Sequence, residues 1–297
     1  MLDYRKYLEP QIIAQLENIE LKARLVVEGF ITGLHRSPYH GFSVEFAEYR
    51  QYRPGDEIRH IDWKVFGRTE KFFVKQFEEE TNLRSILSVD SSASMGFASK
   101  GNISKFEYST YLAASIAYML IKQRDAIGLA LYDTKVQTYL PPRSKPSYIY
   151  EILKALVATK PANETGTSRA LDELAERIKR RGLVVIFSDF FDDPQSVLNA
   201  LKHFRHKNHE VIAFQVLDPR EIDFKFGPGA TFKDLETGEE MITQPYQIQK
   251  TYSMAIKDFI SYIETECHNH NIEYQLINTS EPFDKALREY LTKRSKM

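Results

Sequence analysis

The sequence predicts an α/β protein with a doubly wound, mostly parallel sheet of six strands and one antiparallel strand at its edge. From about residue 82 onward, short apolar runs alternate with segments of helical periodicity. The run at 183–188, LVVIFS, is apolar on both faces, as expected for a strand covered by helices on both sides. The runs at 127–133 and 134–140 adjoin each other, so they form a hairpin rather than a crossover.

The alternation begins with a strand over 83–89 and a helix over 104–125. Ser104 is the expected N-cap of this helix, and Glu107 lies three residues later as its capping-box partner. Residues 229–243, with Glu-Thr-Gly between alternating segments, predict a small hairpin inserted before a long helix. The other expected helices cover 146–158, 167–181, Pro194 to about His206, 246–269 and 281–294, and the other strands cover 183–188, 210–217 and 272–277.

The first 80 residues are interpreted as an accessory segment, ahead of a sheet domain at 81–297. Residues 11–31 have apolar positions at helical spacing, whereas 34–80 combine turn signals with many aromatic residues. Because disordered segments are poor in aromatic residues, we expect 34–80 to be ordered and fixed to the sheet domain. Trp63, the only tryptophan, is expected to lie in a core.

Composition excludes several classes of protein. The chain has 40 basic and 41 acidic residues, so it lacks the basic footprint of a nucleic-acid-binding protein. Its single cysteine, Cys267, permits neither an intrachain disulfide nor a thiolate zinc cluster. The start, MLDYRKYLEP, lacks the apolar core of a signal peptide, and no uncharged apolar run approaches the ~18 residues of a membrane span. We therefore expect a cytoplasmic protein with no direct membrane insertion.

Enzyme motifs are also missing from the sequence. There is no Gly-x-Ser-x-Gly nucleophile turn and no Gly-x-x-x-x-Gly-Lys-Ser/Thr phosphate loop. No histidine follows another predicted strand to activate Ser92 or Ser94 as a nucleophile. The sequence thus favours a protein that is not an enzyme.

Polar residues gather in three loops that the fold brings to one edge of the sheet. The strand ending in ILSVD is followed by serines, so that Asp90, Ser92 and Ser94 lie in the first loop. Thr167 opens a helix in the second loop, and Asp189 follows the strand 183–188 in the third. Because ligand crevices of open parallel sheets form at the carboxyl ends of the strands, these side chains are expected to meet.

Hydroxyl and carboxylate oxygens are ligands for a hard divalent cation, which keeps several waters of its own. The loops therefore predict a site for Mg²⁺ or Mn²⁺. Because few anionic groups would contact the cation directly, it would attract a further carboxylate from a protein partner.

The three loops together resemble the metal-ion-dependent adhesion site of the von Willebrand factor type A domain. Asp90-Ser91-Ser92-Ala93-Ser94 matches its Asp-x-Ser-x-Ser motif, Gly166-Thr167 its threonine loop, and Ser188-Asp189 its third motif, and the resemblance covers about residues 82–297. It implies that Ser92, Ser94 and Thr167 contact the metal, whereas Asp90 and Asp189 act mainly through water or hydrogen bonds. The third loop reads Ser-Asp-Phe instead of the commoner Thr-Asp-Gly, so Phe190 is the residue expected to crowd the site.

A second resemblance lies within HRSPYHGFSVEFAEYRQYRPGDEIRHIDWK at 35–64. Its core from Arg50 to Trp63 is similar to bacterial proteins of the Domain of Unknown Function 58 family, which carry a von Willebrand A-like domain behind this segment. Many of those proteins are encoded beside chaperone-like MoxR-type AAA+ ATPases. The charged residues of the core are candidates for partner binding, with a salt-bridged structural segment as the alternative. These residues are Arg50, Arg53, Asp56, Arg59 and Asp62.

The sequence therefore predicts a non-enzymatic protein-interaction module. Its Mg²⁺ would bind a carboxylate of a MoxR-type ATPase or of that ATPase's client, in the assembly or activation of other proteins. Two alternatives stay open. One is a metal-dependent hydrolase acting at the same crevice, and the other is a scaffold whose metal site is vestigial.

Overall fold

The computed structural model describes residues 43–53, 61–80, 84–226, 230–233, 235 and 240–282. The chain divides into two compact units, one formed by residues 36–83 and the other by the remainder. The helices expected over 11–31 and 281–294 lie outside the described residues. No helix in the described ranges is both long and apolar enough to cross a membrane.

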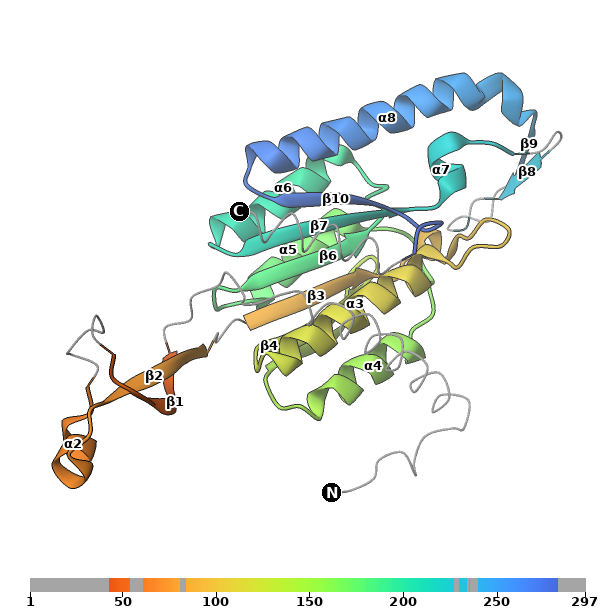
Figure 1. Cartoon of the computed structure of the whole chain (residues 1–297). Coiled ribbons are helices and arrows are strands. Elements are labelled where there is room, and N and C mark those ends of the chain that lie inside the picture. Colours follow the sequence, from red (N-terminus) through yellow and green to blue (C-terminus); the bar gives the residue numbers. More distant parts are fainter. Residues whose placement is uncertain are drawn as a thin grey trace, which may run out of the picture. The chain divides into compact units, whose positions relative to one another are not determined.

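The larger unit is built on a six-stranded sheet, which confirms the predicted fold class. The strands lie in the order β10-β7-β6-β3-β4-β5, and every neighbouring pair is parallel except β4 and β5 (Figure 1). This is the von Willebrand A-like arrangement. Its strands are β3 (Arg84–Asp90), β4 (Ala126–Tyr132), β5 (Val136–Arg143), β6 (Leu183–Ser188), β7 (Glu210–Leu217) and β10 (Glu273–Asn278).

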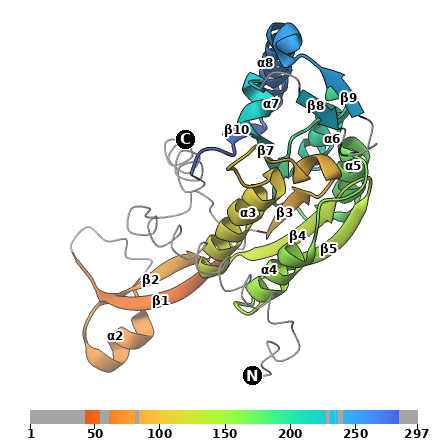
Figure 2. The same cartoon turned by 90° about the vertical axis from the view of Figure 1, so that its right-hand side faces the viewer.

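Helices cover both faces of this sheet, as Figures 1 and 2 show. Ser104 caps α3 by accepting the backbone N–H of Glu107 over 3.1 Å, as the sequence predicts. Pro194 lies at the start of α6, where its missing N–H is not needed. The helices are α3 (Lys105–Lys122), α4 (Tyr148–Ala158), α5 (Thr167–Arg177), α6 (Pro194–His206), the short α7 (Pro219–Asp223) and α8 (Pro245–Asn269).

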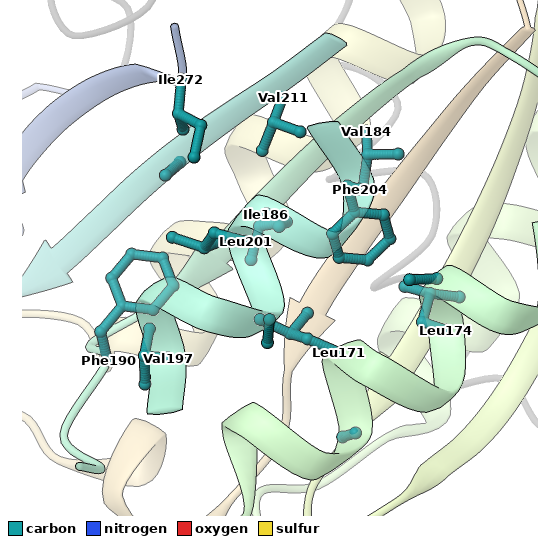
Figure 3. Packing of buried hydrophobic residues seen from close by; sticks show 14 of the residues in the cluster. Leu171, Leu174, Val184, Ile186, Phe190, Val197, Leu201, Phe204, Val211 and Ile272 are labelled. Atoms are coloured by element: carbon teal, nitrogen blue, oxygen red, sulfur yellow. The ribbon is translucent and has the colours of Figure 1, made fainter. Parts of the chain in front are cut away.

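The core between the sheet and the pair α5 and α6 is fully closed to solvent. Leu171 and Leu174 of α5 and Leu201 and Phe204 of α6 pack against Ile186 and its neighbours on the strands (Figure 3). Burying a side chain of this size stabilises the fold by about 1.5–3 kcal/mol. This packing holds the ends of β3 and β6 in fixed positions, and the predicted site lies at those ends.

Two hairpins complete the larger unit. β5 pairs antiparallel with β4 at the sheet's edge, as predicted from the short connection between them. The predicted insertion is also present, as an antiparallel pair of β8 (Ala230–Lys233) and β9 (Glu240–Thr243).

The smaller unit contains a hairpin that the sequence pattern did not reveal. β1 (Ser43–Gln51) and β2 (Phe73–Glu80) are antiparallel, and α2 (Trp63–Thr69) lies between them in the chain. The register shifts between Phe46 and Glu48, so the apolar alternation of β1 changes phase midway and is hard to recognise. Trp63 is 57% exposed, and its ring meets Phe66 and Phe72 edge-on, so the expectation of a core tryptophan was wrong.

Candidate functional site

The three predicted loops meet at the carboxyl edge of the central strands. Asp90 is the last residue of β3, Thr167 is the first of α5, and Asp189 directly follows β6. The second loop is tied to the first, because Ala93 N–H donates to the carbonyl of Asn163 over 2.9 Å. Gly166 lets the second loop also pass close to the turn between β4 and β5, since a Cβ there would lie 2.8 Å from the Cα of Thr134.

Asp90 is the centre of the site. Its Oδ2 accepts hydrogen bonds from Ser188 Oγ at 2.6 Å and from Thr167 Oγ1 at 3.2 Å, and its Oδ1 accepts one from Ser92 N–H at 2.9 Å. Burial raises the pKa of Asp90 to about 6, and the charge of Asp189 adds to the increase, although the hydrogen bonds act against it. The fold thus holds a carboxylate whose charge lacks full compensation.

The serines of the first loop connect Asp90 to the third loop. Ser92 Oγ lies 3.2 Å from Ser94 Oγ, and Ser94 Oγ donates to Asp189 Oδ2 over 2.9 Å. Asp189 also accepts the backbone N–H of Phe191 at Oδ1, over 3.0 Å. The five residues predicted from the loops therefore form one continuous hydrogen-bonded cluster.

A lysine that sequence reasoning missed also belongs to this cluster. Lys105, the first residue of α3, is completely buried and donates from Nζ to Asp189 Oδ2 over 2.7 Å and to Glu221 Oε1 over 2.6 Å. Burial alone would lower the pKa of Lys105, but the charges of Asp189 and Glu221 outweigh it, so the pKa is raised and the ammonium stays charged. In sequence, a lysine at a helix start gives no sign of such burial.

Glu221 connects the site to α7. Burial raises its pKa to about 7, although the charge of Lys105 acts in the opposite direction. Asp218 caps α7 in a reciprocal capping box with Glu221, and its Oδ2 also accepts the N–H and the hydroxyl of Ser99 from the loop before α3. One network of charges thus joins α3, the third loop and α7.

Two expectations about the loops need correction. A site that accepts a carboxylate from a partner, as the sequence predicts, would be expected to be open to solvent, but Asp90, Ser92, Thr167 and Asp189 are fully buried, and Ser94 is partly buried. Phe190 does not crowd the cluster. Its side chain is fully buried in the core beside Val197 of α6 (Figure 3).

The backbone of Phe190 explains why glycine is commoner at this position. Its φ of 58° lies in the left-handed region, which costs a residue with a Cβ roughly 1–2 kcal/mol. Burying the ring offsets that cost. This chain therefore keeps the left-handed backbone that a glycine would adopt, and the buried ring of Phe190 holds the loop against the core.

The residues of the cluster fit a hard divalent cation. Among the described residues, no three His, Cys, Asp or Glu side chains form a metal cluster, so a cation here would depend on hydroxyl oxygens as well as carboxylates. The ammonium of Lys105 contacts two carboxylates, those of Asp189 and Glu221, whereas the hydrogen-bond donors to Asp90 are two hydroxyls and one backbone N–H, all neutral. Burial raises the pKa of Asp90 and the charge of Asp189 adds to the increase, and a divalent cation bound here would act against both.

The candidate partner-binding residues of the N-terminal signature are only partly described. Asp62 has a structural role, because Oδ1 accepts the N–H groups of Lys64 and Val65 and so caps α2. Arg50 lies on β1 opposite Val74. Asp56 and Arg59 lie outside the described residues, and the assignment of the set, Arg53 included, to partner binding stays a prediction.

Comparison with known proteins adds family membership to this geometry. Residues 48–258 match the family described as "Protein of unknown function DUF58". The chain is 30% identical over 234 residues to the uncharacterized protein Rv1480 of Mycobacterium tuberculosis and to the uncharacterized protein Mb1516 of Mycobacterium bovis. In both cases the match covers 77% of this chain and 73% of the relative.

Among solved structures, the chain is similar to BatB from Bacteroides thetaiotaomicron, with 16% identity and a TM-score of 0.44. It is also similar to an aerotolerance-related membrane protein from Bacteroides fragilis, with 15% identity and a TM-score of 0.46; each match covers 72% of this chain and 100% of the other. The VWA domain of SpRpn10 is 11% identical, with a TM-score of 0.41 over 70% of this chain and 95% of that domain. The fold assignment rests on the strand order given above.

Proposed function

The chain belongs to the family of proteins of unknown function DUF58, and from this membership and the site we propose a non-enzymatic protein-interaction module with a metal-ion-dependent adhesion-type site. One observation carries the proposal. Oxygen donors from three separate loops meet around Asp90, a buried carboxylate with too little positive charge nearby.

In this proposal Ser92, Ser94 and Thr167 offer hydroxyl ligands to Mg²⁺ or Mn²⁺. Asp90 orients Thr167 and the backbone of Ser92, and Asp189 orients Ser94, through the hydrogen bonds described above. When bound, the cation would supply a coordination position for a carboxylate of a partner protein, which would approach past Ser94, the member of the five that is only partly buried. By resemblance, that partner is a MoxR-type AAA+ ATPase or its client.

Lys105 supports an interaction role over a catalytic one. Its ammonium shares Asp189 Oδ2 with the hydroxyl of Ser94. Because this oxygen is already bonded to the ammonium, it is poorly placed to take the proton of Ser94 and so to activate that hydroxyl as a nucleophile. The same contact favours indirect participation of Asp189 in metal binding.

Lys105 is also the specific observation that favours the alternative of a scaffold with a vestigial metal site. Its ammonium supplies one positive charge to the cluster without any metal. Against this alternative stands Asp90, a fully buried carboxylate whose hydrogen-bond donors in the described part of the chain are the neutral groups of Ser92, Thr167 and Ser188.

Metal-dependent partner binding tests the proposal. Purified chain is immobilised, and the MoxR-type ATPase from the same organism is passed over it with Mg²⁺ or with EDTA. Binding should require Mg²⁺ and be lost in Asp90→Asn. Asp192→Asn should bind normally, because it changes a carboxylate of the third loop whose partners among the described residues are Ser168 and the N–H of Asp193.

Binding that is equal in EDTA would support the scaffold. Hydrolysis of generic phosphate or ester substrates by the chain, lost in Asp189→Ala, would instead support the metal-dependent hydrolase.

A further inference from the structure

A cavity of about 230 Å³ lies at the edge of the sheet opposite to the metal-type site. It is open to solvent and is bounded by the amino ends of β3 and β6, the last residues of β5 and the segment that follows α5. Ile86, Val184 and Ile178 contribute apolar wall, and Pro141 and Pro142 line the side toward β5. The volume is just below the roughly 300–1,000 Å³ of pockets that bind drug-sized molecules, so the cavity suits a small ligand.

The charges around this cavity have one sign. Arg84, Arg177, Lys179 and Arg180 line it, and none of the described lining residues is a carboxylate. Arg177 pairs outside the lining with Glu173, at 2.5 Å, while within the described ranges Arg84, Lys179 and Arg180 form no ion pair. The carboxyl end of α5 contributes roughly half a negative charge, which accounts for part of the basic character. With Arg177 offset by Glu173, an excess of roughly two to three positive charges still remains.

The other polar groups of the cavity are neutral. Burial lowers the pKa of His209, whose Nδ1 accepts the N–H of Gly182 over 3.2 Å. Burial raises the pKa of Tyr139, although the charges of Arg84 and Arg177 oppose the increase. The phenol of Tyr139 therefore stays protonated and is available as a hydrogen-bond donor. The guanidinium groups of Arg84 and Arg177 are near enough to influence its pKa.

We propose that this cavity binds a small organic phosphate, with the phosphate near Arg84 and Arg177 and the apolar part of the ligand against Ile86 and Val184. A guanidinium donates two parallel hydrogen bonds to phosphate oxygens, which makes arginine the side chain suited to this group. The half-buried Arg84 gains a counter-ion that the described part of the chain does not offer. This site is independent of the metal-type site and would be a second binding function.

Calorimetric titration of the full-length chain with phenyl phosphate tests the proposal, with inorganic phosphate as the probe that lacks the apolar part. Phenyl phosphate should saturate one site per chain and bind more tightly than inorganic phosphate. Arg84→Gln should weaken binding at least tenfold. Arg180 is an exposed residue of the lining, so the Arg180→Gln variant should fold normally. Its affinity for phenyl phosphate should be several-fold lower than that of the wild type.

Lys202→Gln is the matched control, because it removes a cation that pairs with Glu266 away from the cavity. It should bind phenyl phosphate like the wild type. Absence of saturable binding, or equal loss in Lys202→Gln, would overturn the proposal. Saturation by an acidic peptide but not by phenyl phosphate would also overturn it and assign the cavity to a protein partner.

Discussion

At Asp90, hydrogen bonds compensate only in part for the loss of water. Three donors contact the carboxylate, yet its pKa rises from 3.8 to about 6 because the side chain is buried and Asp189 is near. A turn residue at the surface would bear no such cost. The shift corresponds to roughly 3 kcal/mol that a bound cation would recover.

The pH dependence of metal binding follows from this pKa. Mg²⁺ affinity should be constant above about pH 7 and fall as the pH decreases through 6, because a protonated Asp90 no longer attracts a cation. The stability of the metal-free chain depends on pH with the opposite sign. Asp90 adds to the free energy of unfolding below its usual pKa of 3.8, and this contribution is lost as the pH rises through its pKa of about 6 in the folded chain. Titration calorimetry between pH 5 and 8 measures the first effect. An affinity that is unchanged over this range would contradict it.

At Phe190 the burial of the ring outweighs the strain of its left-handed backbone. Phe190→Gly should relieve roughly 1–2 kcal/mol of strain but lose about 3–5 kcal/mol of core packing, so the free energy of unfolding should fall by ~1–4 kcal/mol. Asn208→Gly is the matched control, because Asn208 also has a left-handed φ, of 63°, but is exposed. In urea denaturation, the free energy of unfolding of Asn208→Gly should equal that of the wild type or be slightly higher. If Phe190→Gly were stabilising, the ring would not be an anchor.

At the scale of elements, Lys105 holds three of them together. Lys105→Met should lower the free energy of unfolding by about 3–5 kcal/mol, because it leaves the carboxylates of Asp189 and Glu221 buried and unpaired. Without the ammonium, Mg²⁺ should raise the melting temperature more than it does in the wild type. The double variant Lys105→Met, Glu221→Gln should recover part of the stability. An equal Mg²⁺ shift in wild type and Lys105→Met would show that the ammonium does not act on the cation.

The edge hairpin depends on a close approach of two backbones. A Cβ on Gly128 of β4 would lie 2.5 Å from the carbonyl oxygen of Leu140 on β5, so Gly128→Ala should cost about 1–3 kcal/mol of unfolding free energy. Gly67→Ala in α2 is the control, since a Cβ there meets nothing within 4 Å and alanine favours a helix. Urea denaturation compares the two, and the fluorescence of the nearby Trp63 reports on the control. Equal effects would contradict the packing argument.

For the whole molecule, strand ends were predictable and long-range ion pairs were not. Asp90, Thr167 and Asp189 come together because parallel strands deliver their carboxyl ends to one edge, which the order of elements already implies. The contacts of Lys105 join residues 84 and 116 positions apart, and no local pattern encodes them. The hairpin of β1 and β2 stayed hidden because a bulge shifts the phase of its alternation.

Direct binding of Mn²⁺ is the most decisive test of the proposed metal site. Mn²⁺ is titrated into the wild type, Asp90→Asn and Asp192→Asn, and the bound ion is counted by electron paramagnetic resonance with and without acetate as a free carboxylate. We predict one ion per chain in the wild type and in Asp192→Asn, bound more tightly with acetate because ligand and metal strengthen each other reciprocally, and none in Asp90→Asn. Saturable binding that persists in a folded Asp90→Asn chain, or no binding by the wild type even with acetate, would contradict the account.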